Sequence, residues 1–177
     1  MDNHETSEQT QHLTFQLAGE EYAIGILRVK EIIEYGPLTH VPQTPPFVRG
    51  VINLRGSVVP VVDLAIKFGI TPSAITDRTC IVIVEVALDG EQAVIGLITD
   101  SVNQVVDLPA GDVLAAPPFG TRIKADFLRG MAKTENKFLL ILDIDRLLGA
   151  DALCDPVAMQ RFGPENSDGH EANQEKP

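Results

Sequence analysis

The chain has 177 residues, with 14 Lys and Arg against 25 Asp and Glu, and its formal net charge is −11. Hydrophobic residues make up 44% of it, which suits one globular domain or two small ones. The charge balance argues against nucleic acid as a partner, because binding it requires an excess of Lys and Arg. No apolar run approaches the roughly 18 residues of a membrane span, and the N-terminus lacks a leader pattern. We therefore expect a soluble, cytoplasmic protein without membrane insertion.

Much of the negative charge lies at the two ends of the chain. Residues 1–12 carry a net charge of −3 and residues 151–177 carry −4, which leaves −4 for residues 13–150. Both ends are poor in large apolar residues, so they cannot bury enough surface to offset the entropy of ordering. We expect two disordered acidic tails around one folded region, 13–150. The segment 155–163 is compatible with a short helix.

In chain order, the first predicted element is a β-hairpin. Residues 13–17 alternate apolar and polar, Gly19 interrupts the pattern, and residues 22–26 resume it. A second hairpin is predicted from the apolar run 80–88, the dipeptide Asp89-Gly90 and the apolar run 93–98, because Asp-Gly favours a two-residue turn. The run 80–88 is apolar on both faces and is expected to be a central strand. Frequent Pro and Gly between short strands indicate an all-β barrel or sandwich.

An internal repeat is the most informative feature of the sequence. Residues 47–69 match residues 127–149 at a spacing of 80 without a gap. Upstream, residues 24–34 match residues 95–107 if the second copy has two extra residues. The repeat predicts two half-barrels that arose by duplication.

Each copy has the same predicted structural plan. A Phe-Val/Leu-Arg-Gly turn is followed by an apolar strand, and an Asp then begins a short helix that ends at Gly. The Asp residues are expected to be helix N-caps, since their carboxylates accept hydrogen bonds from the exposed N–H groups of the first turn. The terminal Gly residues suit the left-handed position after a helix. These structural roles fall on the turn residue Gly130, the caps Asp63 and Asp143, and the terminal residues Gly69 and Gly149.

The sequence contains little that points to catalysis. Its four His residues have no metal-ligand spacing, and it has neither a phosphate-binding Gly loop nor a Gly-x-Ser-x-Gly motif. Cys80 lies in an apolar run that gives no base to activate it. Asp100, at a strand end, alone supports the alternative of a small-ligand or enzymatic module. We expect no enzyme, no metal and no cofactor.

Arg55 is the candidate functional residue that the repeat singles out. It lies in a predicted tight turn within INLRGSVVPVVDL (52–64), and the matching residue of the second copy is Glu135. Its guanidinium could cap a carbonyl or pair with a surface acid of this chain. It could also bind a partner's carboxylate through two parallel hydrogen bonds. The spacing alone leaves both interpretations open.

The sequence resembles the CheW-like coupling proteins of bacterial chemotaxis. The resemblance covers about residues 13–150 and rests on ordered blocks, namely EEYAIGILRVKEII, VPQTPPFVRGVINLRGSVVPVVDL, IVIVEV, GLITDSVNQVVDL, FLRGMA and LLILDIDRLL. It implies two packed five-stranded SH3- or OB-like β-barrels that exchange segments, with short helices and no catalytic activity. It also implies a cytoplasmic adaptor at receptor arrays. The implied partners are the cytoplasmic tips of methyl-accepting chemoreceptors and the regulatory domain of the histidine kinase CheA.

The resemblance also implies site residues. Receptor binding is expected in a groove between the subdomains at Val29, Glu31, Ile32 and Arg55. Core packing is the alternative for Val29 and Ile32. Gly50 matches a position associated with kinase contact, although a turn that needs a permissive φ would explain it equally well. An alternative function is the same adaptor role in a non-flagellar array that governs type IV pili or surface sensing.

Overall fold

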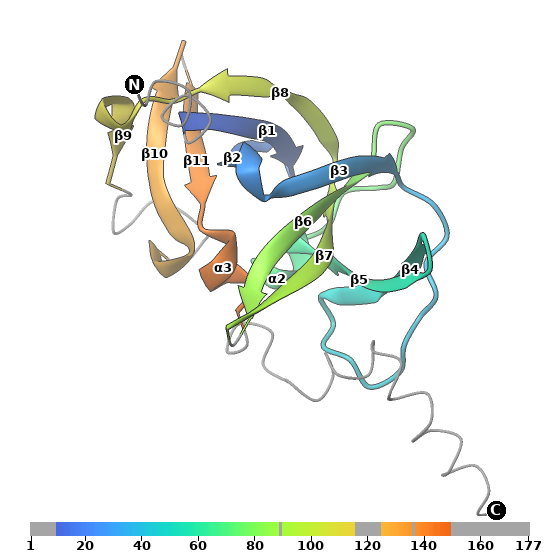
Figure 1. The fold of residues 1–177 in the computed structure, drawn as a ribbon. Coiled ribbons are helices and arrows are strands. Elements are labelled where there is room, and N and C mark those ends of the chain that lie inside the picture. The colour runs from blue at the N-terminus through green and yellow to red at the C-terminus, as the bar shows by residue number, and fades with distance from the viewer. Residues whose placement is uncertain (1–9, 89, 116–124, 136, 150–177) are drawn as a thin grey trace, which may run out of the picture.

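A computed structural model describes residues 10–88, 90–115, 125–135 and 137–149 (Figure 1). The two predicted tails beyond residue 12 and before residue 151, and the possible helix 155–163, lie outside these ranges except for residues 10–12. The described chain consists mainly of strands, which confirms the predicted all-β class. The strands are β1 (Gln11–Leu17), β2 (Glu20–Gly25), β3 (Val29–Glu34), β4 (Val48–Leu54), β5 (Ser57–Asp63), β6 (Cys80–Leu88), β7 (Glu91–Thr99), β8 (Ser101–Asp107), β9 (Val113–Leu114), β10 (Leu128–Thr134) and β11 (Lys137–Leu142).

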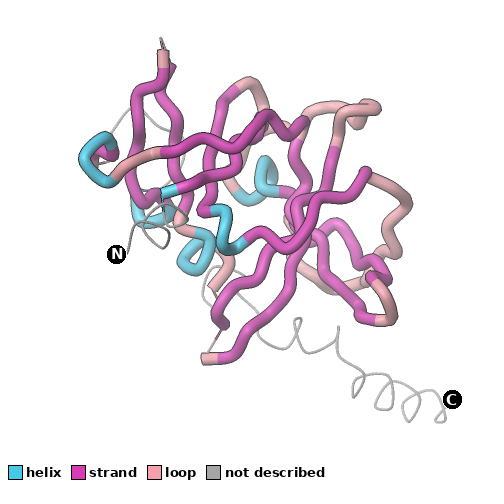
Figure 2. Tube along the Cα trace, turned by 45° about the horizontal axis from the view of Figure 1, so that its top comes forward, coloured by secondary structure: helices cyan, strands magenta, loops and turns pink. Residues whose placement is uncertain are grey.

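Short helices connect these strands (Figure 2). They are η1 (Ile26–Arg28), α2 (Leu64–Lys67), η2 (Ala110–Asp112), η3 (Ala125–Phe127) and α3 (Ile144–Leu147). None of them has the length and apolar character that crossing a bilayer requires.

The strands form two sheets. Sheet A has the order β8-β1-β2-β11-β10-β9, and sheet B has the order β3-β6-β7-β5-β4. Pairing is antiparallel except between β2 and β11 and between β5 and β7. Sheet B thus has the predicted five strands, whereas sheet A gains a sixth strand of two residues, β9.

Both predicted hairpins are present. Ala18 and Gly19 form the two-residue turn of β1–β2 with φ of 52° and 85°, the left-handed conformation that such a turn requires. In β6–β7, Leu88 pairs with Glu91 across the second turn. β6 lies between β3 and β7, and residues 81–84 are at most 1% exposed. The apolar pattern on both faces of this strand therefore reflects a central position.

The duplication is visible in the strand order. β4, β5 and α2 of sheet B correspond to β10, β11 and α3 of sheet A, at the spacing of 80 residues. β3 follows β2 along the chain but joins sheet B, and β8 follows β7 but joins sheet A. Each half therefore gives one strand to the other half, as segment exchange predicts.

The structure corrects the alignment of the upstream segments. Ile141 pairs with Ala23, and Val61, its equivalent in the first copy, pairs with Gly96. Ala23 therefore corresponds to Gly96, which is a spacing of 73. The same spacing relates β3 to β8, so no gap lies between 24 and 34. The two extra residues lie in the longer hairpin β6–β7, because β7 extends two residues farther from Gly96 than β2 does from Ala23.

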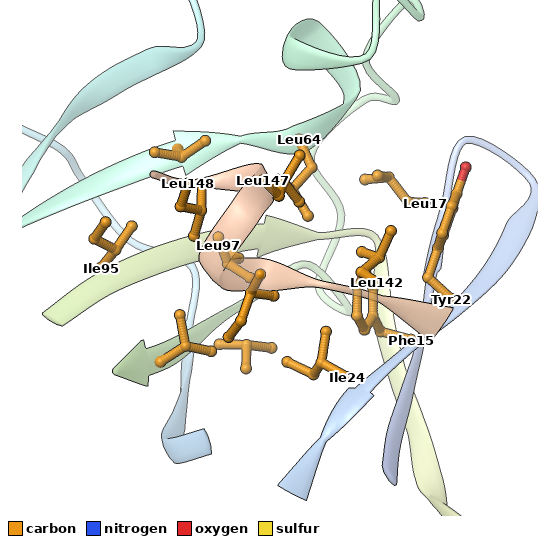
Figure 3. Packing of buried hydrophobic residues seen from close by; sticks show 14 of the residues in the cluster. Phe15, Leu17, Tyr22, Ile24, Leu64, Ile95, Leu97, Leu142, Leu147 and Leu148 are labelled. Carbon is orange, nitrogen blue, oxygen red and sulfur yellow. The ribbon is translucent and has the colours of Figure 1, made fainter. Parts of the chain in front are cut away.

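Three apolar clusters hold the fold together. The largest lies between the sheets and combines side chains of both, such as Phe15 of β1 and Leu97 of β7 (Figure 3). Phe15 also stacks on Tyr22, with ring centroids 6.0 Å apart. Each sheet has a smaller cluster of its own, which includes Ile141 in sheet A and Ile83 in sheet B. Burial of this apolar surface is the main stabilising term.

The predicted N-caps form at both short helices. The Asp63 carboxylate accepts hydrogen bonds from the backbone N–H groups of Ala65 and Ile66, and the Asp143 carboxylate accepts one from Arg146. Asp63 also pairs with Arg49 at 3.1 Å, and its side chain is 6% exposed, against 29% for Asp143. The two equivalent caps therefore differ in burial.

We expect Asp63→Ala to lower the free energy of unfolding by about 2 kcal/mol, because it removes a cap and a hydrogen-bond acceptor of Arg49. The matched Asp143→Ala variant is expected to lose about 1 kcal/mol, the usual cost of a cap. Urea unfolding followed by far-ultraviolet circular dichroism measures both, since the chain has no Trp. Equal losses would contradict the greater weight given to Asp63.

The glycines of the repeat only partly match their predicted roles. Gly69 has the left-handed φ of 76° after α2, as predicted. Gly149 has no such φ, and a Cβ there would lie 2.9 Å from the Asp145 carbonyl oxygen. Gly149 is thus required by close approach to α3, and the predicted left-handed position is wrong.

Gly50 and Gly130 lie inside β4 and β10 at register shifts, so the predicted turns at these residues are also wrong. A Cβ would lie 2.6 Å from the Thr39 oxygen at Gly50 and 2.6 Å from the Leu114 oxygen at Gly130. The neighbouring backbone passes too close for any side chain. Both glycines are therefore needed for strand packing, in equivalent places of the two sheets.

Candidate protein-interaction site

The four residues predicted to bind a receptor all belong to sheet B. Val29, Glu31 and Ile32 lie in β3, at one edge of the sheet, and Arg55 lies in the turn between β4 and β5, at the other edge. We call these four residues the β3 site. Two segments at opposite ends of the strand order thus form one surface.

The turn that presents Arg55 has a strained backbone conformation. Arg55 has φ of 53° and Gly56 has φ of 89°, and the Gly56 N–H donates to Asn53 Oδ1 at 2.8 Å. Leu54 pairs with Ser57 on either side of the turn. Glu135 of the second copy has φ of 54°. The predicted tight turn is therefore present in both copies, and only its charge differs.

Arg55 and Glu31 form an ion pair across the two edges of sheet B. Both Arg55 Nη atoms donate to the carboxylate, with Nη2 at 3.0 Å from Glu31 Oε1. The Arg55 side chain is 74% exposed and the Glu31 side chain 27%. At the spacings found here, the equivalent residues in sheet A are Glu135 and Gln104, which cannot form such a pair. The ion pair is therefore specific to the first half of the duplication.

Apolar side chains border this ion pair. Ile32 is 42% exposed and Val58, three residues after Arg55, is 48% exposed. Val29 is half-buried and packs against the cluster between the sheets. Core packing thus explains part of Val29 but not Ile32. The site combines a fixed charge pair with exposed apolar surface on a paired strand, a composition that suits a protein partner.

The ion pair sets the ionisation of Glu31. The hydrogen bond from Arg55 holds the pKa of Glu31 below its ordinary value of 4.5, and Glu31 in turn raises the pKa of Arg55. Because the carboxylate form is favoured in the folded protein, the pairing is complete above pH 4.5. It is lost as the pH falls through the lowered pKa.

We expect the Glu31 carboxyl carbon to titrate below pH 4.5 in an NMR experiment, and Arg55→Gln to return its midpoint toward 4.5. Arg55→Gln keeps a hydrogen-bonding side chain but removes the charge. High salt is expected to shift the midpoint in the same direction, since the pair is exposed. A midpoint that is the same in both proteins would show that the pair does not persist in solution.

Asp100, the residue behind the enzymatic alternative, has structural partners. Its Oδ2 atom accepts hydrogen bonds from the Ala18 N–H and the Ser73 hydroxyl, each at 2.8 Å. The interior of sheet B nearby is filled by buried side chains, including Ile98. The described residues contain no group of three or more His, Cys, Asp and Glu that could hold a metal ion. These contacts give no support to an enzymatic site at Asp100.

Two other predicted features can be placed. Cys80 is half-buried, and burial raises the pKa of its thiol, as expected for an unreactive cysteine. Arg28 forms a two-pronged ion pair with Asp145, which also accepts the Ala87 N–H at 3.1 Å. No sequence pattern signals this pair, because 117 residues separate its members. It joins η1 to α3.

Comparison with known proteins identifies the family. The model of the CheW-like domain family matches residues 11–152. The chemotaxis protein CheW of Klebsiella aerogenes is 36% identical over 148 residues, covering 82% of this chain and 87% of that protein. CheW of Bacillus subtilis is 33% identical over 141 residues, covering 79% and 87%. The crystal structure of the scaffolding protein TtCheW from Thermoanaerobacter tengcongensis has a TM-score of 0.72 and 34% identity, covering 81% and 90%. The described fold and these matches together show that the chain belongs to the family of CheW-like domains.

Proposed function

We propose that this protein is a non-catalytic adaptor that couples methyl-accepting chemoreceptors to the histidine kinase CheA. Its relatives are chemotaxis proteins, and the related solved structure is named a scaffolding protein. The observation that carries the proposal is the Glu31–Arg55 pair, which the duplicated scaffold does not reproduce in its other half. A charged group that the fold does not need twice is available for a partner.

The β3 site is the proposed receptor contact. Arg55 uses two of its donors on Glu31 and keeps the others available, since its side chain is 74% exposed. Ile32 supplies exposed apolar surface on the same sheet. A receptor tip with an apolar side chain beside a carboxylate would match this arrangement. The strands of sheet B hold these groups in place, so little entropy is lost on binding.

The proposed kinase contact at Gly50 has a structural complication. Gly50 has no room for a Cβ beside the Thr39 backbone, so even Ala must displace residues 38–39. We therefore expect Gly50→Ala to lower the melting temperature as well as kinase binding. Gly130→Ala, with the same close approach in sheet A, is the matched control for stability. Kinase binding lost in Gly50→Ala but kept in an equally destabilised Gly130→Ala would support a direct contact. Equal losses in both would argue against one.

Co-sedimentation tests the coupling role as a whole. Membranes that contain a chemoreceptor are mixed with CheA and this protein, and the pellet is analysed for all three. We expect CheA to sediment only when this protein is present, and kinase activity to follow receptor ligand. CheA that sediments equally well without this protein would contradict the proposal. Receptors and kinases from flagellar and non-flagellar arrays form the two arms of the assay.

A further inference from the structure

Two cavities of similar size lie beside the two short α-helices. One of about 350 Å³ lies beside α3, with Leu27, Arg129 and Asp143 among its lining residues. We call it the α3 cavity. The other, of about 370 Å³, lies beside α2 and includes Asp63 and Asp100 in its lining. We call it the α2 cavity.

The duplication relates these cavities to each other. The pairs Arg129 and Arg49, Asp143 and Asp63, and Leu27 and Asp100 occupy equivalent positions, at spacings of 80, 80 and 73. Each cavity also has a carboxylate that accepts a backbone N–H from the first strand of a hairpin or its turn. Asp100 accepts that of Ala18, and Asp145 accepts that of Ala87. The cavities are therefore two versions of one structural feature.

The chain that follows α2 forms one wall of the α2 cavity. Residues 72–75 line it, and the Ser73 hydroxyl donates to Asp100 Oδ2 at 2.8 Å. The chain that follows α3 begins at residue 148, and residue 149 is the last in the described ranges. Among the described residues, none after Asp145 lines the α3 cavity. Leu27, which occupies the place of Asp100, is 62% exposed there.

We propose that residues 151–155 dock over the α3 cavity, with Leu153 against Leu27. Leu153 follows Ser73 by 80 residues, and Leu27 precedes Asp100 by 73, so the hydrogen-bonded pair of the first half becomes an apolar pair in the second. Two apolar partners at positions where the other copy has two polar ones indicate a matched exchange, since either residue alone would leave an unpaired group.

Chain length and charge support the same occupant. Four residues separate Gly149 from Leu153, as four separate Gly69 from Ser73. Asp151 and Asp155 on either side of Leu153 are acidic, and Arg129 lines the cavity. Gly149 does not have the left-handed φ of Gly69, so docking requires a rotation at Gly149 that glycine permits without a steric penalty.

Disulfide formation in the full-length protein tests the contact. Cys80→Ser and Cys154→Ser remove the native thiols, and Leu27→Cys with Leu153→Cys places one thiol on each partner. The control combines Leu153→Cys with Val105→Cys, because Val105 is exposed on β8. We expect the Leu27 pair to form an intramolecular disulfide at least about tenfold faster than the control, since docking raises the effective concentration. Equal rates, or a disulfide between two molecules, would overturn the proposal.

A second measurement keeps Leu153 in place. The methyl signals of Leu27 are followed by NMR in the unmodified protein, in Leu153→Asp and in Met159→Asp. We expect Leu153→Asp to move these signals and Met159→Asp to leave them unchanged. Signals that are the same in all three proteins would show that the segment does not contact Leu27. Neither measurement uses a receptor or a kinase, so failure here leaves the proposed coupling role untouched.

Discussion

Arg55→Glu is expected to weaken binding to receptor tips by roughly thirtyfold or more, the scale at which truncating an interface hot spot acts. It reverses the charge presented to the partner and separates Arg55 from Glu31 by like-charge repulsion. The melting temperature is expected to change little, because exposed ion pairs contribute little to stability. Glutamate also tolerates the backbone conformation, since Glu135 has φ of 54° in the equivalent turn. Receptor-membrane sedimentation and thermal unfolding together measure the result.

A charge swap separates a partner contact from a purely internal one. Glu31→Arg combined with Arg55→Glu restores the ion pair within sheet B but reverses both charges toward the receptor. We expect this double variant to bind as poorly as Arg55→Glu alone. Recovery of binding in the double variant would mean that the pair acts only by joining the edges of the sheet. Lys133→Glu, an exposed residue of β10, controls for net charge.

Phe15→Ala is expected to have the largest effect on stability. Phe15 is fully buried in the cluster between the sheets and stacks on Tyr22. Removing its ring costs about 3–5 kcal/mol from lost burial and the cavity that remains. This is a large part of the roughly 5–15 kcal/mol by which domains are stable. Urea unfolding is expected to show a much lower midpoint and, near body temperature, partly unfolded protein.

Phe138→Ala is the matched control for this substitution. Phe138 is 55% exposed in β11, so the same truncation is expected to change the free energy of unfolding by less than about 0.5 kcal/mol. A small effect of Phe15→Ala would mean that the two sheets do not depend on their shared cluster. Loss of receptor binding in a folded Phe138→Ala would instead assign a contact to sheet A.

Local patterns in the sequence were sufficient for the separate elements. The alternating residues 13–17 and the Asp89-Gly90 dipeptide predicted the hairpins, and the repeat at a spacing of 80 predicted two equivalent halves. Asp63 and Asp143 were readable as caps because a cap and its helix lie within three residues. Each of these features depends on chain neighbours, which a sequence displays directly.

Only the tertiary structure decided the contacts between distant segments. Gly50 and Gly130 look like turn residues in sequence, yet they are needed because Thr39 and Leu114 pass close by. The upstream alignment was off by two residues, since only the pairing of β2 with β11 and of β5 with β7 sets the register. The Arg55–Glu31 pair forms because opposite edges of sheet B meet. Such contacts depend on how strands are ordered in space, and neither periodicity nor spacing along one chain encodes that order.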